Sequence, residues 1–442
     1  MARRRLERAR SLAIDISPVR DSVPYRALWL GQIISLVGTQ MRYVAVPYQV
    51  FRLTGSNLAV GLIGVAEVVP LIAFSLIGGS IADSMDRRRL IAWTQVGLMV
   101  TSGALAVVTL LSRHPSLGWI YGLTAVSAAL SAVDRPARSA MVPSLVRPEQ
   151  LSAAMALRQV VMQVSQIVGP AIGGALIALF ARGAATSQTG IGAVYLIDAV
   201  TFVGSLVALR WVPQQDPQEL FGPQELAERR SIAGQLKAVR EGVSFAVSKQ
   251  VISAVFLIDL SAMIFGMPRA VFPALAIRSF HGGAGVLGLL SAAPAVGALL
   301  GALSTGWVPR VRRQGRAVIA AVAVWGLGIT FAGLALFSLP LTLLLLAIAG
   351  AADVISAVFR GTMLLENTPD VLRGRLTALQ IMVVTGGPRL GDVEAGTVAS
   401  FVGAPASVVI GGIGCLVGTA AVAAGLREFR VYEAAATGSS PT

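Results

Sequence analysis

The sequence predicts an all-α integral membrane protein of about twelve transmembrane helices, arranged as two parallel six-helix repeats. Three observations predict this class: a low content of charge, a series of long apolar stretches, and one long polar segment in the middle. Of the 442 residues, 55% are hydrophobic and 13% are charged, and the mean hydropathy is +0.73. A soluble domain carries roughly 25% charged residues, so this chain lacks the charge needed to coat a water-facing surface.

The apolar stretches fall into two groups of six. Each stretch provides the roughly 20 residues that a helix needs to cross the hydrocarbon layer. The expected helices begin near Tyr25, Asn57, Arg89, Leu117, Leu151 and Ile191, and then near Val251, Gly285, Ala317, Leu341, Arg375 and Ser407. The resulting division is a tail (1–24), a bundle (25–213), a linker (214–249), a second bundle (250–430) and a disordered tail (431–442).

The linker carries its own helical pattern. Apolar residues recur at helical spacing, which predicts an amphipathic helix along the membrane surface: Ile232, Leu236, Val239 and Val243.

Basic residues set the expected orientation. Of 36 Lys and Arg residues, 29 fall in the N-terminus, the even-numbered loops and the C-terminus. Only four lie in odd-numbered loops, and three lie within helices (Arg42, Arg269 and Arg389). This asymmetry predicts that both termini and the linker are cytoplasmic. We therefore expect a multi-pass protein of the bacterial inner membrane.

Two matched positions support an internal repeat. Pro70 followed by Arg88-Arg89 recurs at a constant offset as Pro294 followed by Arg312-Arg313. Parallel repeats of this kind are typical of one large class of transporters.

The loop after the second stretch carries a motif. It contains Gly79, Asp83, Arg87, Arg88 and Arg89, and it resembles the signature of the major facilitator superfamily, G-x-x-x-D-(R/K)-x-G-R-(R/K)-(R/K). Ser84 and Asp86 depart from the basic residue and the glycine of that signature. The resemblance implies that Asp83 and Arg87 latch the cytoplasmic side, whereas a simple stop-transfer cluster is the alternative.

The fifth stretch carries Gly169, Pro170, Gly173 and Gly174. Glycines four apart let a neighbouring helix approach closely, and the proline bends the helix. The pattern resembles the antiporter motif G-P-x-x-G-G of the same superfamily, which implies export; an ordinary kinked helix is the alternative.

Further segments resemble the enterobactin-exporter-like branch of the superfamily, over about Ala27 to Leu426. They are 136–143 with 149–151, 54–56, 195–199 and 387–391. This resemblance implies alternating access and proton antiport of drug-like or siderophore-like molecules. The fourth stretch lacks the Arg-x-x-Gln-Gly motif of many drug/proton antiporters, so the resemblance does not identify the residues that carry protons.

Charged residues inside the membrane are costly and indicate function. Near the midplane we expect Glu67, Asp259 and Asp353, with Arg42 close enough to reach Glu67. The remaining candidates for proton coupling or substrate binding follow in the eleventh stretch: Arg389 and Asp392, which share a helix face, and Glu394, which points elsewhere. For each acid, a structural ion pair is the alternative to a coupling role.

Several functions are disfavoured. Two histidines and one cysteine (Cys415) provide no metal site or disulfide framework, and no Gly-Lys-Ser/Thr step provides a P-loop. We expect no cofactor, no enzyme activity, no nucleic-acid binding despite the net charge of +14, and no required protein partner. The expected partners are a small molecule, protons and lipid. An importer of a small metabolite and a non-transporting receptor or scaffold remain as alternatives.

Overall fold

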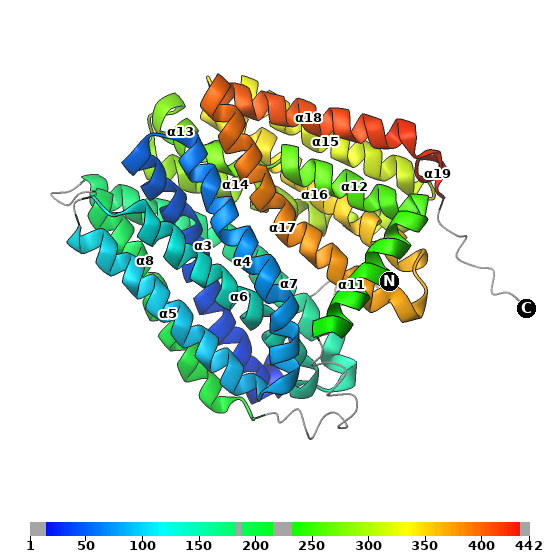
Figure 1. Ribbon diagram of the computed structural model, residues 1–442, viewed down its shortest axis with the longest axis horizontal. Coiled ribbons are helices and arrows are strands. Elements are labelled where there is room, and N and C mark those ends of the chain that lie inside the picture. Colours follow the sequence, from blue (N-terminus) through cyan, green and yellow to red (C-terminus); the bar gives the residue numbers. More distant parts are fainter. Residues whose placement is uncertain (1–14, 113, 183–186, 215–231, 434–442) are drawn as a thin grey trace, which may run out of the picture.

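A computed structural model describes residues 15–112, 114–182, 187–214 and 232–433; the side chains of residues 75–84 and of a few scattered positions are not described. The described part is helical and contains no β-strand. Its long helices lie side by side as one bundle (Figure 1). This confirms the expected all-α membrane fold.

The first six long helices follow the expected order. They are α3 (Val23–Thr54), α4 (Asn57–Ser84), α5 (Arg87–Leu111), α6 (Leu117–Leu145), α7 (Leu151–Arg182) and α8 (Ser187–Ala208). Gly55 ends α3 in the left-handed region, with φ of 63°, which permits the tight turn into α4. A short helix, α2 (Ser17–Asp21), precedes them.

The second group begins after the linker. It comprises α12 (Gln250–Phe265), α14 (Gly283–Leu303), α15 (Gln314–Leu334), α16 (Leu339–Glu366), α17 (Asp370–Val402) and α18 (Ala404–Gly425). A broken segment follows α12, made of η3 (Arg269–Val271), α13 (Phe272–Ala274) and η4 (Leu275–Ser279). The short α19 (Arg427–Val431) ends the described chain, and residues 434–442 of the expected tail lie outside it.

Ten helices of the described part are long and apolar enough to cross a membrane. The two other long helices, α3 and α17, have 32 and 33 residues but are more polar. They carry charged groups such as Arg42 on α3, and Arg389, Asp392 and Glu394 on α17. The count of twelve spans therefore stays a prediction.

Helix contacts repeat between the two groups. In the first group α3 packs against α7 and α8, α4 against α6, and α5 against α6 and α8. In the second group α12 packs against α17 and α18, α14 against α16, and α15 against α16 and α18. The same pairs occur in both groups when the six long helices of the first group are matched in order with those of the second, α3 with α12 and so on to α8 with α18. The two halves are therefore folded alike.

Two helix crossings join the halves, α4 with α17 and α7 with α14. Gly61 on α4 approaches Gly396 on α17, and Gly174 on α7 approaches Gly288 on α14. Gly61 and Gly288 lie near the starts of α4 and α14, and Gly174 and Gly396 lie near the ends of α7 and α17. Both crossings are therefore at the end of the bundle that carries α13, and the two groups of helices diverge toward the other end (Figure 1). We call the end with α13 the outer end and the opposite one the inner end, following the predicted orientation.

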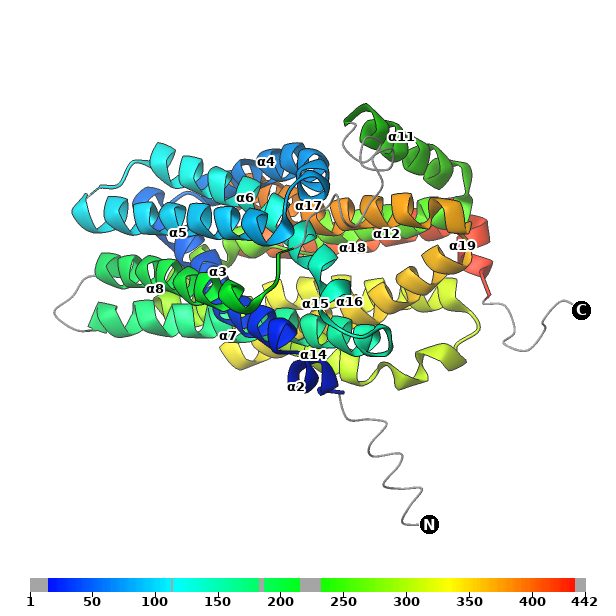
Figure 2. The ribbon, with the colours of Figure 1, turned by 90° about the horizontal axis from the view of Figure 1, so that it is seen from below.

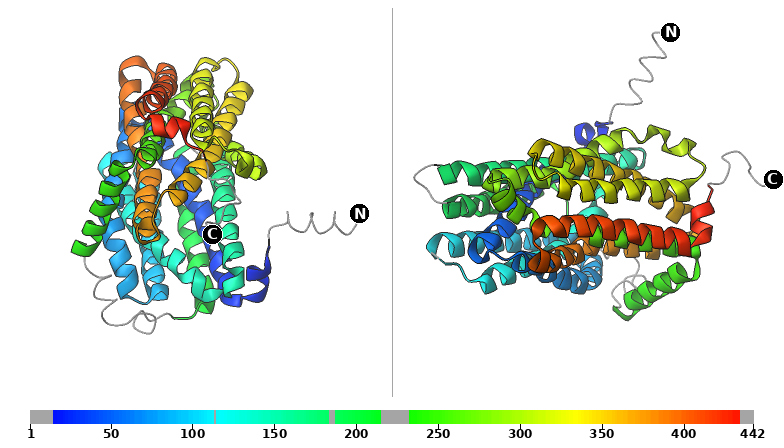
Figure 3. Two further views of the ribbon diagram at one scale, coloured as in Figure 1. Left: turned by 90° about the vertical axis from the view of Figure 1, so that its right-hand side faces the viewer. Right: turned by 90° about the horizontal axis from the view of Figure 1, so that it is seen from above.

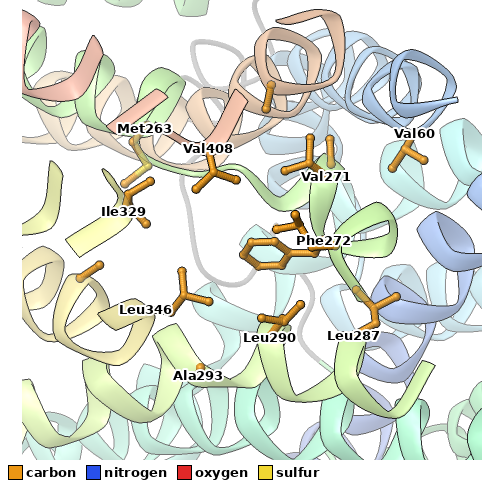
Figure 4. Close-up of a cluster of buried hydrophobic side chains, with 14 of the residues drawn as sticks. Val60, Met263, Val271, Phe272, Leu287, Leu290, Ala293, Ile329, Leu346 and Val408 are labelled. Atoms are coloured by element: carbon orange, nitrogen blue, oxygen red, sulfur yellow. The ribbon is translucent and has the colours of Figure 1, made fainter. Parts of the chain in front are cut away.

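The segment after α12 is fixed in an apolar cluster. Val271 and Phe272 are buried. Figure 4 shows them among side chains of α12, α14 and α16, such as Met263, Leu290 and Leu346. Burial of several large side chains, each contributing roughly 1.5–3 kcal/mol, holds this broken segment of short helices in place.

Within the predicted linker the structure has a helix, α11 (Ile232–Ser248), which lies outside the bundle in Figure 2 and in the right-hand view of Figure 3. Glu241 of α11 forms an ion pair with Arg375 of α17. Its expected position on the membrane surface stays a prediction, and residues 215–231 lie outside the described part.

Candidate functional site

The expected pairing of Arg42 with Glu67 is wrong. Arg42 forms an ion pair with Asp198 of α8, at 3.5 Å, and donates hydrogen bonds to Ser102 and Ser127. The Ser102 hydroxyl also donates to Asp198, at 2.7 Å, and all these side chains are buried. Consecutive helices α3 and α4 touch less extensively than α3 and α8, so Arg42 meets an acid far away in the sequence.

A second buried cluster lies within the second half. The Arg360 guanidinium is 2.9 Å from the Asp259 carboxylate and 3.6 Å from that of Asp353, and it also donates to Ser356. Asp259 and Arg360 are 3% and 2% exposed. The two candidate acids on α12 and α16 therefore share one arginine, and within this half they form a fixed structural unit.

The apolar stretches predict Arg360 and Arg138 among the 29 basic residues outside the membrane-spanning helices. Arg360 instead lies inside α16, as Arg138 lies inside α6, where it pairs with Asp134 at 2.7 Å. Both assignments were wrong because the helices extend beyond their most apolar stretches. The four-residue spacing of Asp134 and Arg138 was a signal that would have revealed the second pair.

Glu67 belongs to the crossing between the halves. Its carboxylate accepts a hydrogen bond from the Arg389 Nε–H of α17, at 3.0 Å. Arg389 also donates to the Tyr43 hydroxyl, at 3.0 Å, and lies over the Tyr43 ring. Glu67 lies ten residues from the start of α4, about 15 Å along the helix. This ion pair joins the halves at the α4–α17 crossing, and its expected place near the membrane midplane stays a prediction.

Asp392 and Glu394 lie three and five residues beyond Arg389 on α17. Asp392 interacts electrostatically with Arg269 and Arg389, yet no guanidinium is within 4 Å of it in the described part. Its Oδ1 is buried without a hydrogen-bond partner. Glu394 makes no hydrogen bond or ion pair among the described residues, and its expected direction away from Asp392 stays a prediction.

The loop motif is only partly described. The side chains of Gly79 and Asp83 lie outside the described part. Arg87 is buried and donates to the Ala140 carbonyl of α6, at 2.9 Å. Asp86, which departs from the family signature, accepts a hydrogen bond from the Arg89 backbone N–H and so caps the start of α5.

The motif on α7 lies between two neighbouring helices. A side chain at Gly173 would meet the Met41 backbone of α3 at 3.0 Å, and Gly169 faces the same helix. On the other side, the Pro170 carbonyl and Gly174 touch Gly288 of α14. The motif therefore lets α7 contact its own half and the other half at once.

A second copy of this motif occupies the equivalent place on α17. The segment Gly387 to Asp392 reads GPRLGD, where the segment from Gly169 to Gly174 reads GPAIGG. Gly391 packs against Met263 of α12, as Gly173 packs against Met41 of α3. Arg389 and Asp392 are thus charged replacements within a repeated motif. Alignment of the two halves would have found this.

No group of three or more His, Cys, Asp or Glu side chains in the described part could hold a metal ion.

The fold is shared with solved transporters. A bacterial homologue of the human lysosomal transporter Spinster, in an inward-facing and unoccupied conformation, is 17% identical with a TM-score of 0.71, covering 96% of this chain and 100% of that one. The nucleoside transporter NupG is 10% identical with a TM-score of 0.72, covering 91% and 98%. The two like halves share the fold of these transporters, and the family model that matches the chain places it in the major facilitator superfamily.

Within this class the family is defined. The chain belongs to the family described as "Transmembrane secretion effector", whose profile matches residues 13–441. It is similar to the protein named "Enterobactin exporter EntS" of Citrobacter koseri (27% identity over 410 residues, 92% of each chain) and of Shigella boydii (28% over 411 residues, 92% of each). The chain is a multi-pass membrane transporter of small molecules and not an enzyme.

Proposed function

We propose that this chain is a secondary active exporter, which carries small organic molecules out of the cell across the bacterial inner membrane in exchange for protons. The named activity of its relatives and the Gly-Pro motif on α7 both favour export over import. The substrates are amphiphilic drugs or siderophore-like compounds. Transport proceeds by alternating access, in which the two halves rock about the central charged residues.

The observation that carries this proposal is the way in which the halves meet. Both crossings lie toward the outer end and are lined by small residues, and one of them is bridged by the Glu67–Arg389 ion pair. Glycine contacts separate without exposing large apolar side chains, and an ion pair can exchange partners. The outer end is thus built to open, while residues such as Asp83 and Arg87 latch the inner end.

The proton is carried by a carboxylate of the interior. The candidates are Glu67, Asp259, Asp353 and Asp392, of which Asp259 and Asp353 share Arg360. Glu67 lies at the crossing that must open, so its ionisation and the position of the halves are linked.

Dye efflux tests this proposal. Cells that express the wild type, Asp83→Asn, Glu67→Gln or Asp259→Asn are loaded with a fluorescent dye and followed with and without a protonophore. We expect efflux by the wild type, its loss with the protonophore, and its loss in at least one variant that reaches the membrane in normal amounts. Dye accumulation driven by the wild type would refute export and favour the importer.

A further inference from the structure

One arginine in the interior is both surrounded and accessible. Arg269 begins η3, just after the break in α12, and interacts electrostatically with Asp392 and Arg389 of α17, Tyr43 of α3 and Asp353 of α16. Its own side chain is nevertheless exposed. Arg269 is therefore reached by solvent and lies close to charged or polar groups of α3, α16 and α17.

The backbone that carries Arg269 is held rigidly. The Trp325 indole N–H donates to the Gly266 carbonyl at the break, at 3.0 Å. Ala270 and Val271, which follow Arg269, are buried in the apolar cluster. The guanidinium is therefore presented from an anchored segment, the arrangement expected of a binding residue.

The Arg269 guanidinium has no ion-pair partner within 4 Å among the described residues, and the hydrogen bond that it donates there goes to the Met267 sulfur, at 3.5 Å. Beyond it, the charges alternate in sign along a series: Arg269, Asp392, Arg389 and Glu67. Asp392 interacts with both arginines, and Arg389 pairs with Glu67 at 3.0 Å. The series is neutral overall, accessible at Arg269, and connected to the other half at Glu67.

We propose that Arg269 binds the anionic group of an organic substrate, a carboxylate or a phenolate, and that this binding shifts the pairing by one step along the series. The substrate pairs with Arg269, Asp392 turns to Arg389, and Glu67 is released. Because Glu67–Arg389 bridges the α4–α17 crossing, its release weakens the outer end and favours opening. This inference rests on the proposed export function and assigns its substrate class.

Partner exchange is favoured by the cost of unpaired charge. A charge in a low-dielectric interior is strongly destabilising when it has no partner of opposite sign. When a substrate anion pairs with Arg269, the nearby charged side chains therefore change partners so that as few charges as possible stay unpaired. Arg389 and Asp392 are three residues apart on α17, within reach of each other along one helix face. Arg389 can therefore exchange Glu67 of α4 for Asp392 of its own helix as its ion-pair partner.

The first test measures binding. Dansylglycine and its amide, which have nearly the same shape but differ by the carboxylate charge, are titrated into purified protein in phosphatidylcholine nanodiscs. We expect the acid to bind the wild type roughly tenfold or more tightly than the amide does. Arg269→Gln should abolish this preference with amide binding unchanged, and Arg269→Lys should keep part of it. Arg52→Gln, at an exposed position in the last turn of α3, should keep all of it. An acid preference that survives Arg269→Gln would overturn the proposal.

The second test measures opening. Spin labels are attached at Leu58→Cys and Ser400→Cys, both exposed and near the outer ends of α4 and α17, in a Cys415→Ala background. Dansylglycine should lengthen this distance in the wild type. Glu67→Gln should lengthen it without ligand, whereas Asp392→Asn should keep it short even with saturating ligand.

Glu67→Gln and Asp392→Asn each remove one negative charge beside Arg389. If these two acids had only a structural role, both substitutions would change the distance between the spin labels in the same direction. A change in the same direction in both variants would therefore refute the exchange of ion-pair partners.

Failure of the anion site and failure of the proposed export function give different results. If the protein exports neutral dyes but binds the acid no more tightly than the amide, the anion site at Arg269 is refuted and the export function is not. Acid binding through Arg269 without transport of any compound would overturn the exporter alone.

Discussion

The α7–α14 crossing offers a sharp test of the idea that glycine contacts hold the outer end closed. An alanine methyl at Gly174 would lie 2.5 Å from the Ala284 carbonyl oxygen, and 2.9 Å and 3.0 Å from the Cα and N of Gly288. All three atoms belong to the backbone of the other half, so no side-chain rotation relieves the contact. An ordinary contact at this position needs the helices to separate by about 0.9 Å.

We expect Gly174→Ala to shift the protein toward an open outer end. Overpacking of this kind costs about 1–3 kcal/mol in the closed state. Since 1.4 kcal/mol is a factor of about ten in a conformational equilibrium, the open population should rise roughly tenfold. Spin labels at Leu179→Cys and Leu289→Cys, exposed positions on α7 and α14, would report this as a longer distance in a Cys415→Ala background.

Gly122→Ala provides the matched control, because a methyl group there meets no atom within 4 Å. It should leave both the distance distribution and the melting temperature unchanged. An unchanged distance in Gly174→Ala, with normal folding, would show that the crossing does not limit opening.

Three further predictions concern stability and are read as the midpoint of thermal unfolding. Arg42→Met leaves Asp198 buried without its ion pair and should cost about 3–5 kcal/mol; an unchanged midpoint would contradict the structural role of the pair. Arg360→Met should have a comparable effect, whereas Arg373→Met, which breaks an exposed ion pair, should change the midpoint little; equal effects would argue against burial as the cause. Asp86→Ala removes the cap of α5 and should cost about 1 kcal/mol, while Asp86→Asn should retain most of the stability.

The Gly-Pro motifs on α7 and α17 show which contacts of the site could be predicted from the sequence and which could not. The close approach of Gly169 and Gly173 to a neighbouring helix follows from their spacing, and the structure has this contact, on α3. The neighbour of Gly174 does not follow, because it belongs to the other half of the chain. The repeat of the motif at Gly387 to Asp392 was present in the sequence, but its meaning depends on α17 occupying the place of α7.

The sequence by itself determined the class of protein, the order and approximate extent of its helices, and the residues that carry charge into the membrane. These are local properties, because the length of each apolar stretch and the basic residues beside it determine whether that stretch spans the membrane and in which direction. Only the tertiary structure decided which charges meet. Arg389 pairs with Glu67, 322 residues away, and Arg42 pairs with Asp198 instead of Glu67. Such pairs depend on which helix faces meet between non-consecutive helices, and that is a property of the whole bundle.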